Sequence, residues 1–316
     1  MSPQLEAAFF IFGLVAIGYL AGLTGFMRAE AGEALGEFAV GVALPLLLFR
    51  TMLSADFHGT APWALWASYF SAVALAWTIG HLVTTRVLGR DARTGVVGGV
   101  SSSFSNTVLL GLPLVLGVYG QAGFEVLALI VSVHLGIMMA ATIIIFAILE
   151  RGGEKGLRPA ALLKDFVRKL ATNPLIIGIV CGLLWRLMGL PLPSLAARFV
   201  DGLGSIAGPL ALFSMGLGLR RYGISGNLRA GFTLAALKLF VMPAIALGMV
   251  LLFGLPPLAA SVVVLTAALP AGVNCYLIAV QFGTGQALAS NMITIATGLG
   301  VATTAFWITV LHAIFG

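Results

Sequence analysis

The chain has 316 residues, of which 60% are hydrophobic and 9% are charged, and its formal net charge is +6. A soluble domain carries about 25% charged residues, so this chain cannot cover a water-facing surface and is predicted to be an integral membrane protein. Apolar stretches of the roughly 20 residues that a membrane helix needs recur from end to end, whereas the alternating strands of an outer-membrane barrel are not seen.

Ten membrane-spanning helices are predicted from these stretches. They cover, in chain order, residues 6–25, 34–53, 63–88, 97–119, 123–149, 172–190, 203–221, 230–253, 258–281 and 286–314. A long polar connection, 150–171, separates the first five spans from the second five. The sequence therefore predicts an all-α membrane protein with a first five-helix repeat (1–150), a cytoplasmic linker (151–171) and a second five-helix repeat (172–316).

Arginine and lysine residues gather in alternate connections between these spans. If the N-terminus lies outside the cell, the inner connections carry 13 basic residues and the outer connections carry 3, with Lys238 left inside a span. Inner connections of membrane proteins are enriched in basic residues. We therefore expect a multi-pass protein of the inner or plasma membrane with both termini outside, and its positive charge requires no nucleic-acid partner.

The two halves contain similar stretches in the same order. In the second span "LPLLLF" (44–49) matches "GPLALF" (208–213) of the seventh, and "SSSFSNTVLLGLP" (101–113) then falls opposite "LPAGVNCYLIA" (269–279) of the ninth. Halves of five spans each must have opposite orientations in the membrane. Inverted repeats with interrupted helices at matching positions indicate a transporter site near the bilayer midplane. Chance similarity is the alternative, and the shared order argues against it.

Polar residues cluster where the fourth and ninth spans should be interrupted. Pro270 lacks an amide donor and breaks its helix, and irregular backbone at this depth must be buried in protein or line water. Helix N-termini beside such breaks suit a carboxylate. The candidate substrate-binding residues are Ser103, Ser105, Asn106, Thr107, Pro270, Ala271, Gly272 and Asn274. The alternative for the serines is that they only satisfy a kinked backbone or pack helices closely.

Two ionisable side chains inside predicted spans are candidates for a supporting or coupling role. Lys238 lies in the eighth span, where a charge is expensive and indicates function, and His134 lies in the fifth, where an imidazole can relay a proton. The alternatives are that Lys238 extends to the cytoplasmic surface and that His134 is neutral and bonded to a carbonyl.

No aspartate or glutamate is expected deep inside a span, because residues such as Glu125 lie near span ends. Cation exchange through buried carboxylates is therefore not expected. Neither a metal site nor a cofactor is predicted, and Cys181 and Cys275 lie in separate spans, so a disulfide framework is not expected.

Several of these stretches resemble one family. "SNTVLLGLPLV" and "LPAGVNCYLIAVQFG" are similar to the two signature stretches of the auxin efflux carrier family, whose bacterial members include malonate and other small-carboxylate permeases, and the likeness extends over nearly the whole chain. The resemblance implies ten helices in inverted repeats with crossing broken helices 4 and 9. It also implies a dimeric scaffold domain (spans 1, 2, 6 and 7) and a transport domain (spans 3–5 and 8–10). Plant members often have proline where this chain has Ser105.

The predicted function is secondary active or facilitative transport of small organic anions, either malonate-like carboxylates or auxin-like acids, by alternating access of an elevator type. Proton coupling is left open. One alternative is a membrane sensor that binds carboxylates without transporting them. An intramembrane enzyme is disfavoured, because the protease-like "GISG" (223–226) lies in a short basic loop and no His-Glu-x-x-His pattern occurs.

Overall fold

The computed structural model describes residues 2–55, 62–149, 167–168, 171–219 and 228–316, and within them nearly every residue is helical. Seven of the described helical stretches are long and apolar enough to cross a membrane, and Pro174–Met188 and Pro257–Ala268 are shorter apolar helices. The prediction of an all-α membrane protein is confirmed, while the count of ten spans stays a prediction. Most of the predicted linker (151–171) and the "GISG" stretch lie outside the described residues.

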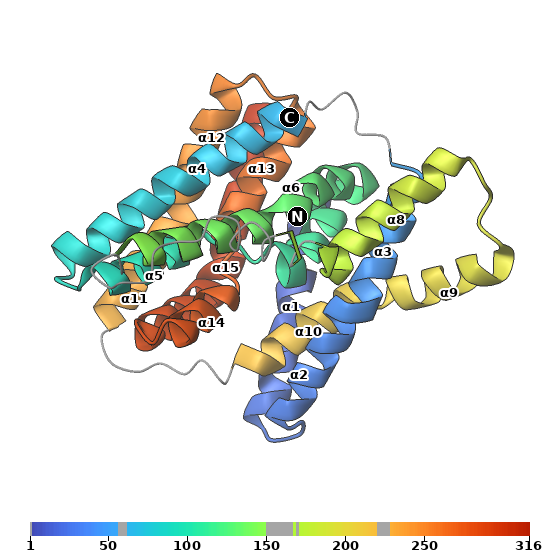
Figure 1. The fold of residues 1–316 in the computed structure, drawn as a ribbon. Coiled ribbons are helices and arrows are strands. Elements are labelled where there is room, and N and C mark those ends of the chain that lie inside the picture. The colour runs from blue at the N-terminus through green and yellow to red at the C-terminus, as the bar shows by residue number, and fades with distance from the viewer. Residues whose placement is uncertain (1, 56–61, 150–166, 169–170, 220–227) are drawn as a thin grey trace. The chain divides into compact units, whose positions relative to one another are not determined.

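The helices form two compact units, each built from segments that are far apart in the sequence (Figure 1). Unit 1 comprises Met1–Thr60, Val108–Ser132 and Arg168–Arg221, and unit 2 comprises Ala61–Thr107, Val133–Val167 and Tyr222–Gly316. Unit 1 contains α1 (Pro3–Leu23), α2 (Ala29–Phe38), η1 (Ala39–Ala43), α3 (Leu44–Leu53), the first part of α6 (Leu112–Leu149), α8 (Pro174–Met188), α9 (Ser194–Ser205) and α10 (Ala207–Gly218). Unit 2 contains α4 (Pro62–Leu82), η2 (Val83–Val87), α5 (Ala92–Ser103), the rest of α6, α11 (Leu228–Ala236), η5 (Leu237–Val241), α12 (Met242–Leu252), α13 (Pro257–Ala268), α14 (Asn274–Gln281) and α15 (Gln286–Phe315).

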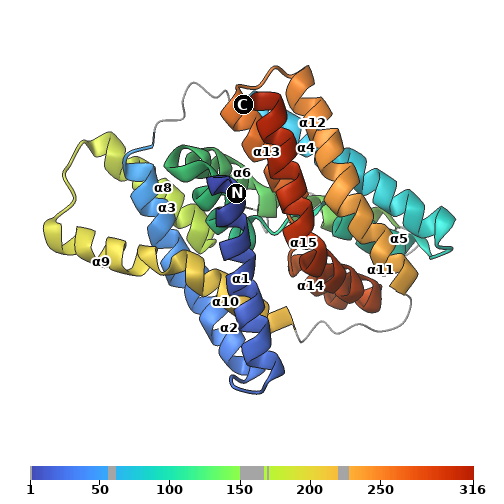
Figure 2. The same ribbon diagram turned by 180° about the vertical axis from the view of Figure 1, so that it is seen from behind.

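Unit 1 is held together by helix pairs that approach closely at glycines. Helix α1 packs on α10, and α3 packs on α8 (Figure 2). A side-chain carbon added to Gly216 of α10 would overlap the carbonyl oxygen of Val15 in α1, and one added to Gly178 of α8 would overlap that of Pro45 in α3. Because lipid is as apolar as the helices, such close packing is a main source of their association.

Unit 2 uses the same device between α4 and α5. A side-chain carbon on Gly98 would overlap the hydroxyl of Thr84, and one on Gly99 would lie 2.5 Å from the indole ring of Trp77. These glycines lie one turn before the end of α5, so they bring the polar end of that helix against α4.

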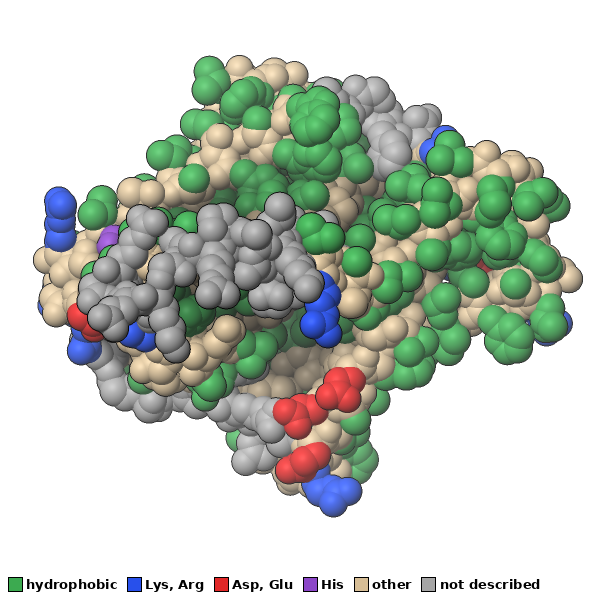
Figure 3. Space-filling view, viewed as in Figure 1, with side chains coloured by type: hydrophobic (Ala, Val, Ile, Leu, Met, Phe, Trp, Pro, Cys, Tyr) green, Lys and Arg blue, Asp and Glu red, His purple; other side chains and the backbone are tan. Residues whose placement is uncertain are grey.

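Large hydrophobic side chains are exposed over the helices (Figure 3). Leu187 of α8 is 81% exposed, Trp63 of α4 77% and Phe10 of α1 64%. Exposed apolar surface of this extent would be unfavourable in water and is expected where lipid tails are the solvent.

Three of the four π-helical turns in the described residues have a common cause, which η2 does not share. Each ends two residues before a proline, in the pairs η1 and Pro45, η3 (Thr107–Gly111) and Pro113, and η5 and Pro243. A proline ring clashes with the carbonyl four residues earlier and supplies no amide to it. A widened π turn relieves the clash and leaves that carbonyl in need of another donor.

For Pro243 the replacement donor is a tryptophan. The carbonyl four residues earlier belongs to Leu239, and the indole Nε1 of the buried Trp307 donates to it at 2.8 Å. Helix α15 thus supplies the hydrogen bond that the proline cannot make, and this bond joins α15 to η5.

We predict that Gly216→Ala destabilises unit 1, because the added methyl group meets the backbone of α1, which cannot move aside like a side chain. Overpacking costs about 1–3 kcal/mol. Gly218→Ala in the same helix is the matched control, since nothing lies within 4 Å of its added carbon. Thermal unfolding of the purified protein in detergent measures both, and equal midpoints for the two variants would contradict the packing argument.

We also predict that Trp307→Phe lowers stability by about 1–3 kcal/mol, because it leaves the carbonyl of Leu239 buried and unpaired. In a Pro243→Ala background the loss should be smaller, since the alanine amide can donate to that carbonyl. A double-mutant cycle on unfolding free energies tests this coupling. The same loss in both backgrounds would show that the indole hydrogen bond does not replace the missing amide.

Candidate functional site

Helix α5 stops inside the fourth predicted span. Phe104 follows it with extended backbone (ψ of 92°), and helical structure resumes at Thr107. In the ninth predicted span α13 ends at Ala268, Leu269 is extended (ψ of 143°), and α14 begins at Asn274. Both non-helical segments, 104–106 and 269–273, belong to unit 2.

The two non-helical segments pair with each other. Ser105 and Ala271 lie opposite one another in an antiparallel bridge. The backbone amide of Asn106 donates to the carbonyl oxygen of Pro270 at 2.9 Å. The backbone amide of Gly272 donates to the carbonyl oxygen of Phe104 at 3.2 Å. Backbone groups that the helix ends leave free are thus satisfied within the protein, as the interior of a membrane requires.

The serines of this region divide into two kinds. The hydroxyls of Ser102 and Ser103 donate to carbonyl oxygens four residues earlier in α5, at 2.9 and 2.8 Å. The hydroxyls of Ser101 and Ser105 are buried and form no hydrogen bond in the described part of the chain. The hydroxyl of Ser103 therefore satisfies the backbone of its own helix, as the alternative to substrate binding predicts. The hydroxyl of Ser105 has no such bond and can bind a ligand.

The structure brings the remaining candidates together around the bridge. Asn106 and Thr107 are buried, and a side-chain carbon on Gly272 would lie 3.4 Å from the Cα of Asn106, so the two segments are in close contact. Asn274 is half-buried as the first residue of α14, and its side-chain amide forms no hydrogen bond with the described residues. Pro270 and Ala271 contribute backbone groups.

Lys238 supports the end of α13. The residue is fully buried in η5, and its ammonium donates to the carbonyl oxygen of Ala267, in the last turn of α13. A cation at a helix C-terminus satisfies a free carbonyl and is favourable with the helix dipole. Complete burial excludes the alternative in which Lys238 extends to the membrane surface.

His134 is enclosed by aromatic rings. Its imidazole lies 4.9 Å from the ring of Phe104, 5.6 Å from that of Tyr69 and 6.4 Å from that of Phe70, between ring centroids. Both ring nitrogens are buried and form no well-aligned hydrogen bond with a described residue, but the backbone carbonyl of Ser105 lies beside the imidazole. The alternative of an imidazole bonded to a carbonyl therefore stays a prediction. This surrounding places His134 directly behind the bridge.

Sequence reasoning missed Tyr69. Its hydroxyl is buried beside Ser105, although neither hydroxyl forms a well-aligned hydrogen bond with a described residue. A single tyrosine in an apolar helix resembles ordinary packing, so the sequence carries no signal for its place next to the bridge.

The far ends of α5 and α14 are tied together as well. The guanidinium of Arg93 donates through Nη2 to the carbonyl oxygen of Phe282 at 2.9 Å, and the hydroxyls of Thr94 and Thr284 are 2.9 Å apart. With the backbone pairing at one end and these bonds at the other, α5 and α14 are fixed to one another at both ends.

Asp91 caps the start of α5. Its carboxylate accepts hydrogen bonds from the hydroxyl of Thr94 (2.7 Å) and from the amides of Arg93 (2.9 Å) and Thr94 (3.0 Å). These bonds, the Thr94 hydroxyl first among them, hold the pKa of Asp91 below its usual value because they favour the charged form.

Glu125 departs from the expectation for acidic residues. It lies near the start of the fifth predicted span, as expected, but it is only 3% exposed. The amide of Gln121 donates to it at 3.5 Å. The helix is interrupted just before it, at Gly120 with a φ of 63°.

In the described residues no group of three or more His, Cys, Asp or Glu side chains could hold a metal ion. The chemistry available at the bridge is hydrogen bonding by hydroxyl, amide and imidazole groups, together with the partial positive charge of helix N-termini. These groups can bind and orient a small polar or anionic molecule.

Comparison with known proteins decides the family. The family described as "Membrane transport protein" matches residues 3–308. The chain belongs to this family. It is the auxin efflux carrier family that the two signature stretches resemble, and the recognition from sequence is confirmed. The protein is therefore a multi-pass membrane transporter by family and not an enzyme.

Three relatives show how widely the transporter family has diverged. The "Putative malonate transporter" of Rhizobium meliloti is 28% identical over 312 residues, which are 92% of this chain and 91% of that protein. An "Uncharacterized transporter" of Methanothermobacter thermautotrophicus is 25% identical over 309 residues, or 97% of this chain and 98% of the relative. The "Lysosomal cholesterol signaling protein" of Mus musculus is 28% identical over 252 residues, which are 76% of this chain but 29% of that protein.

We predict that Asp91→Asn lowers stability at neutral pH by about 0.3–1 kcal/mol, because asparagine still caps the helix but lacks the charge. The pKa of the native carboxyl is depressed, so its contribution is present above the usual aspartate pKa near 4 and is lost as the pH falls through the lower folded value. Unfolding midpoints of both proteins from pH 7 to pH 3 measure this. A difference that does not narrow below pH 4 would contradict a charge effect.

Proposed function

We propose that this transporter carries small organic anions, with malonate-like carboxylates as the first candidates and auxin-like acids as the second. The observation that carries the proposal is the backbone bridge between two interrupted helices, with Ser105, Asn106 and Asn274 around it. The printed name of the Rhizobium meliloti relative supports malonate as the substrate to test first.

The electrostatics of unit 2 favour an anion. Its described residues include one acidic side chain, Asp91, which caps a helix end. They include five basic side chains, Arg86, Arg90, Arg93, Arg229 and Lys238. A buried cation would need carboxylates, whereas a carboxylate needs donors and positive helix ends. The N-terminus of α14 supplies a positive helix end, and the side-chain amide of Asn274 supplies a donor. The backbone amides of Cys275 and Tyr276 already donate to the carbonyl oxygens of Gly272 and Val273.

The proposal includes the finer features that the sequence predicts. These are two inverted five-helix repeats (1–150 and 172–316) joined by a cytoplasmic linker, crossing broken helices 4 and 9, outside termini and a dimer. The division into units agrees in part with a scaffold and a moving transport domain, because the first, second, sixth and seventh predicted spans fall in unit 1. The segment Val108–Ser132, which holds the second half of the fourth span and the start of the fifth, also falls in unit 1 and departs from that division. Movement of unit 2 against unit 1 would expose the substrate site to each side alternately.

We assign Ser103, Thr107, Pro270, Ala271 and Gly272 to shaping the site rather than to direct recognition. Lys238 holds the end of α13 in place beside the site. His134 is the candidate proton-coupling group, since its buried imidazole lies beside the backbone of Ser105 at the bridge. No cofactor is required.

A second candidate is a carboxylate sensor, favoured by one observation. The murine relative with a signalling name is similar to this chain over a region that is 29% of its own length. A protein that binds the same acids without moving them across a bilayer would have this function.

We expect purified protein in liposomes to take up radiolabelled malonate saturably. Asn274→Ala should lower uptake about tenfold or more, because a lost hydrogen bond to a charged group is worth roughly 1.5–3 kcal/mol. Gln281→Ala, in the same helix but exposed, is the matched control and should retain uptake. Normal uptake by Asn274→Ala would remove this asparagine from the site.

The same liposomes test coupling and the alternative. With an inward proton gradient, faster uptake that is lost in His134→Phe would support proton coupling through that residue. Malonate binding to the purified protein without uptake would favour the sensor. Neither binding nor uptake of any acid in a panel of mono- and dicarboxylates would overturn the anion proposal.

A further inference from the structure

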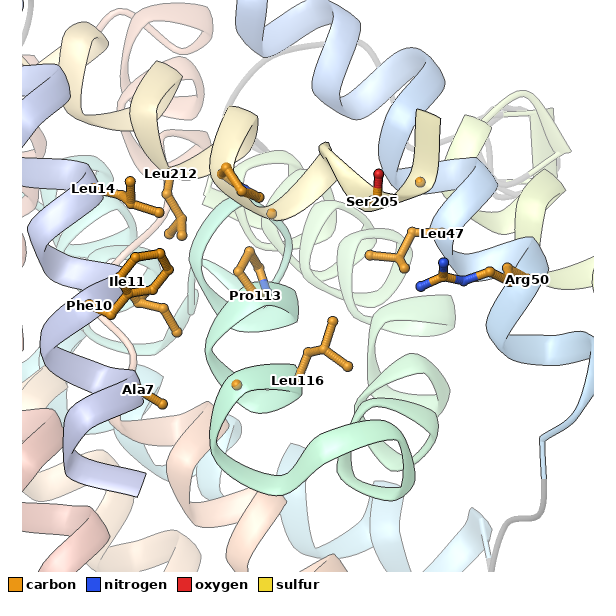
Figure 4. Close-up of a pocket in the computed structure, with 14 residues that line it drawn as sticks. Ala7, Phe10, Ile11, Leu14, Leu47, Arg50, Pro113, Leu116, Ser205 and Leu212 are labelled. Carbon is orange, nitrogen blue, oxygen red and sulfur yellow. The ribbon is translucent and has the colours of Figure 1, made fainter. Parts of the chain in front are cut away.

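A cavity of about 220 Å³ lies within unit 1, and all of its lining residues belong to that unit. Residues of α1, α3, α6, α9 and α10 line it (Figure 4). Its walls are almost entirely apolar, formed by side chains such as Phe10, Leu14, Leu47 and Leu116. Arg50 and Ser205 contribute the polar side chains of the lining.

Arg50 lies in the last turn of α3, and its guanidinium points toward the space between Leu47 and Leu116 in Figure 4. Its Nη1 is 3.3 Å from Oδ1 of Asp201, and the side chains of Arg50 and Asp201 are 38% and 61% exposed. The other donors of this guanidinium form no hydrogen bond in the part of the chain that the structure describes. An exposed ion pair of this kind is weak, so Asp201 does not compete strongly with another anion.

The position of the cavity along the predicted spans indicates its depth. Ala7 lies at the start of span 6–25, Arg50 at the end of span 34–53 and Ser205 at the start of span 203–221, which are all ends on one side of the membrane. Leu14 and Leu212 lie further toward the middle. The cavity therefore has its charged end near the headgroups and its apolar end toward the lipid tails.

We propose that this cavity holds one acyl chain of a membrane phospholipid with an anionic headgroup, whose phosphate binds Arg50. The apolar walls match a hydrocarbon chain, which a water-soluble anion lacks. A guanidinium forms paired, charge-assisted hydrogen bonds with phosphate, and Ser205 can add a hydroxyl donor. The inference goes beyond the transport function and does not depend on it.

A bound lipid would have a physical role in unit 1. The cavity is bordered by α1, the first part of α6 and the junction of α9 and α10. A chain that fills this space restores the van der Waals contacts that an empty cavity lacks.

Native mass spectrometry of the delipidated protein tests the headgroup. We expect one phosphatidylglycerol to be retained in preference to phosphatidylcholine with the same acyl chains. Arg50→Gln should lower retention of phosphatidylglycerol roughly fivefold and leave that of phosphatidylcholine unchanged. Asp201→Asn should raise retention of phosphatidylglycerol, because it frees the guanidinium.

Arg198→Gln is the matched control, since Arg198 is an exposed basic residue of α9 that does not line the cavity. It should retain phosphatidylglycerol like the unchanged protein. Equal losses in Arg50→Gln and Arg198→Gln would show that net charge alone holds the lipid and would overturn the proposal. Equal retention of the two phospholipids by the unchanged protein would overturn it as well.

A second experiment tests the place of the acyl chain. Phosphatidylglycerol with a photoreactive diazirine in mid-chain should label peptides that contain Phe10 to Leu14 or Pro209 to Leu212. Gly208→Phe fills the cavity, because an added carbon there meets Pro113 only at 3.6 Å, and it should abolish this labelling. Labelling confined to other helices, or unchanged labelling in a folded Gly208→Phe protein, would overturn the proposal.

Discussion

The interior of a membrane offers no water to backbone amides and carbonyls, and the architecture of unit 2 follows from this constraint. Interrupting a helix there leaves several polar groups without partners. The two interrupted helices solve the problem jointly, because the segment after α5 and the segment after α13 donate to each other. Neither interruption could be stable by itself at this depth, so the site exists only because two distant parts of the chain meet.

Side chains complete what the backbone pairing leaves unfinished. The indole of Trp307 donates to the carbonyl oxygen of Leu239, to which Pro243 has no amide to donate. The ammonium of Lys238 donates to the carbonyl oxygen of Ala267 at the end of α13. Several polar side chains of the region are thus occupied in keeping the backbone satisfied. Groups without such a bond, such as the side-chain amide of Asn274 and the hydroxyl of Ser105, are the ones that can recognise a solute.

The sequence predicted the class of protein, the polar positions and the break at Pro270, because each depends on local composition and on the chemistry of proline. It could not predict that Ser105 pairs with Ala271, since this pairing joins segments far apart in the chain. The sequence also could not predict which residues surround Lys238 and His134, because these residues too are far away in the chain. Ser103 was assigned to substrate binding although its hydroxyl bonds its own helix, a local preference that outweighs its position in the motif. The burial of Glu125 depends on how its helix packs against the rest of unit 1, which composition alone does not reveal.

The π turn η5 has a geometric consequence for Lys238. A π turn holds one more residue than an α turn, so it rotates everything before it by about 100° relative to everything after it. The face of the helix that carries Lys238 is therefore out of phase with the face that α12 presents. Deleting one residue from this turn would leave the length of the helix almost unchanged but would swing the lysine away from α13. The widened turn changes the direction in which side chains point before and after it. The continuous helix of η5 and α12 can therefore pack its apolar side chains in α12 and still direct Lys238 to the end of α13.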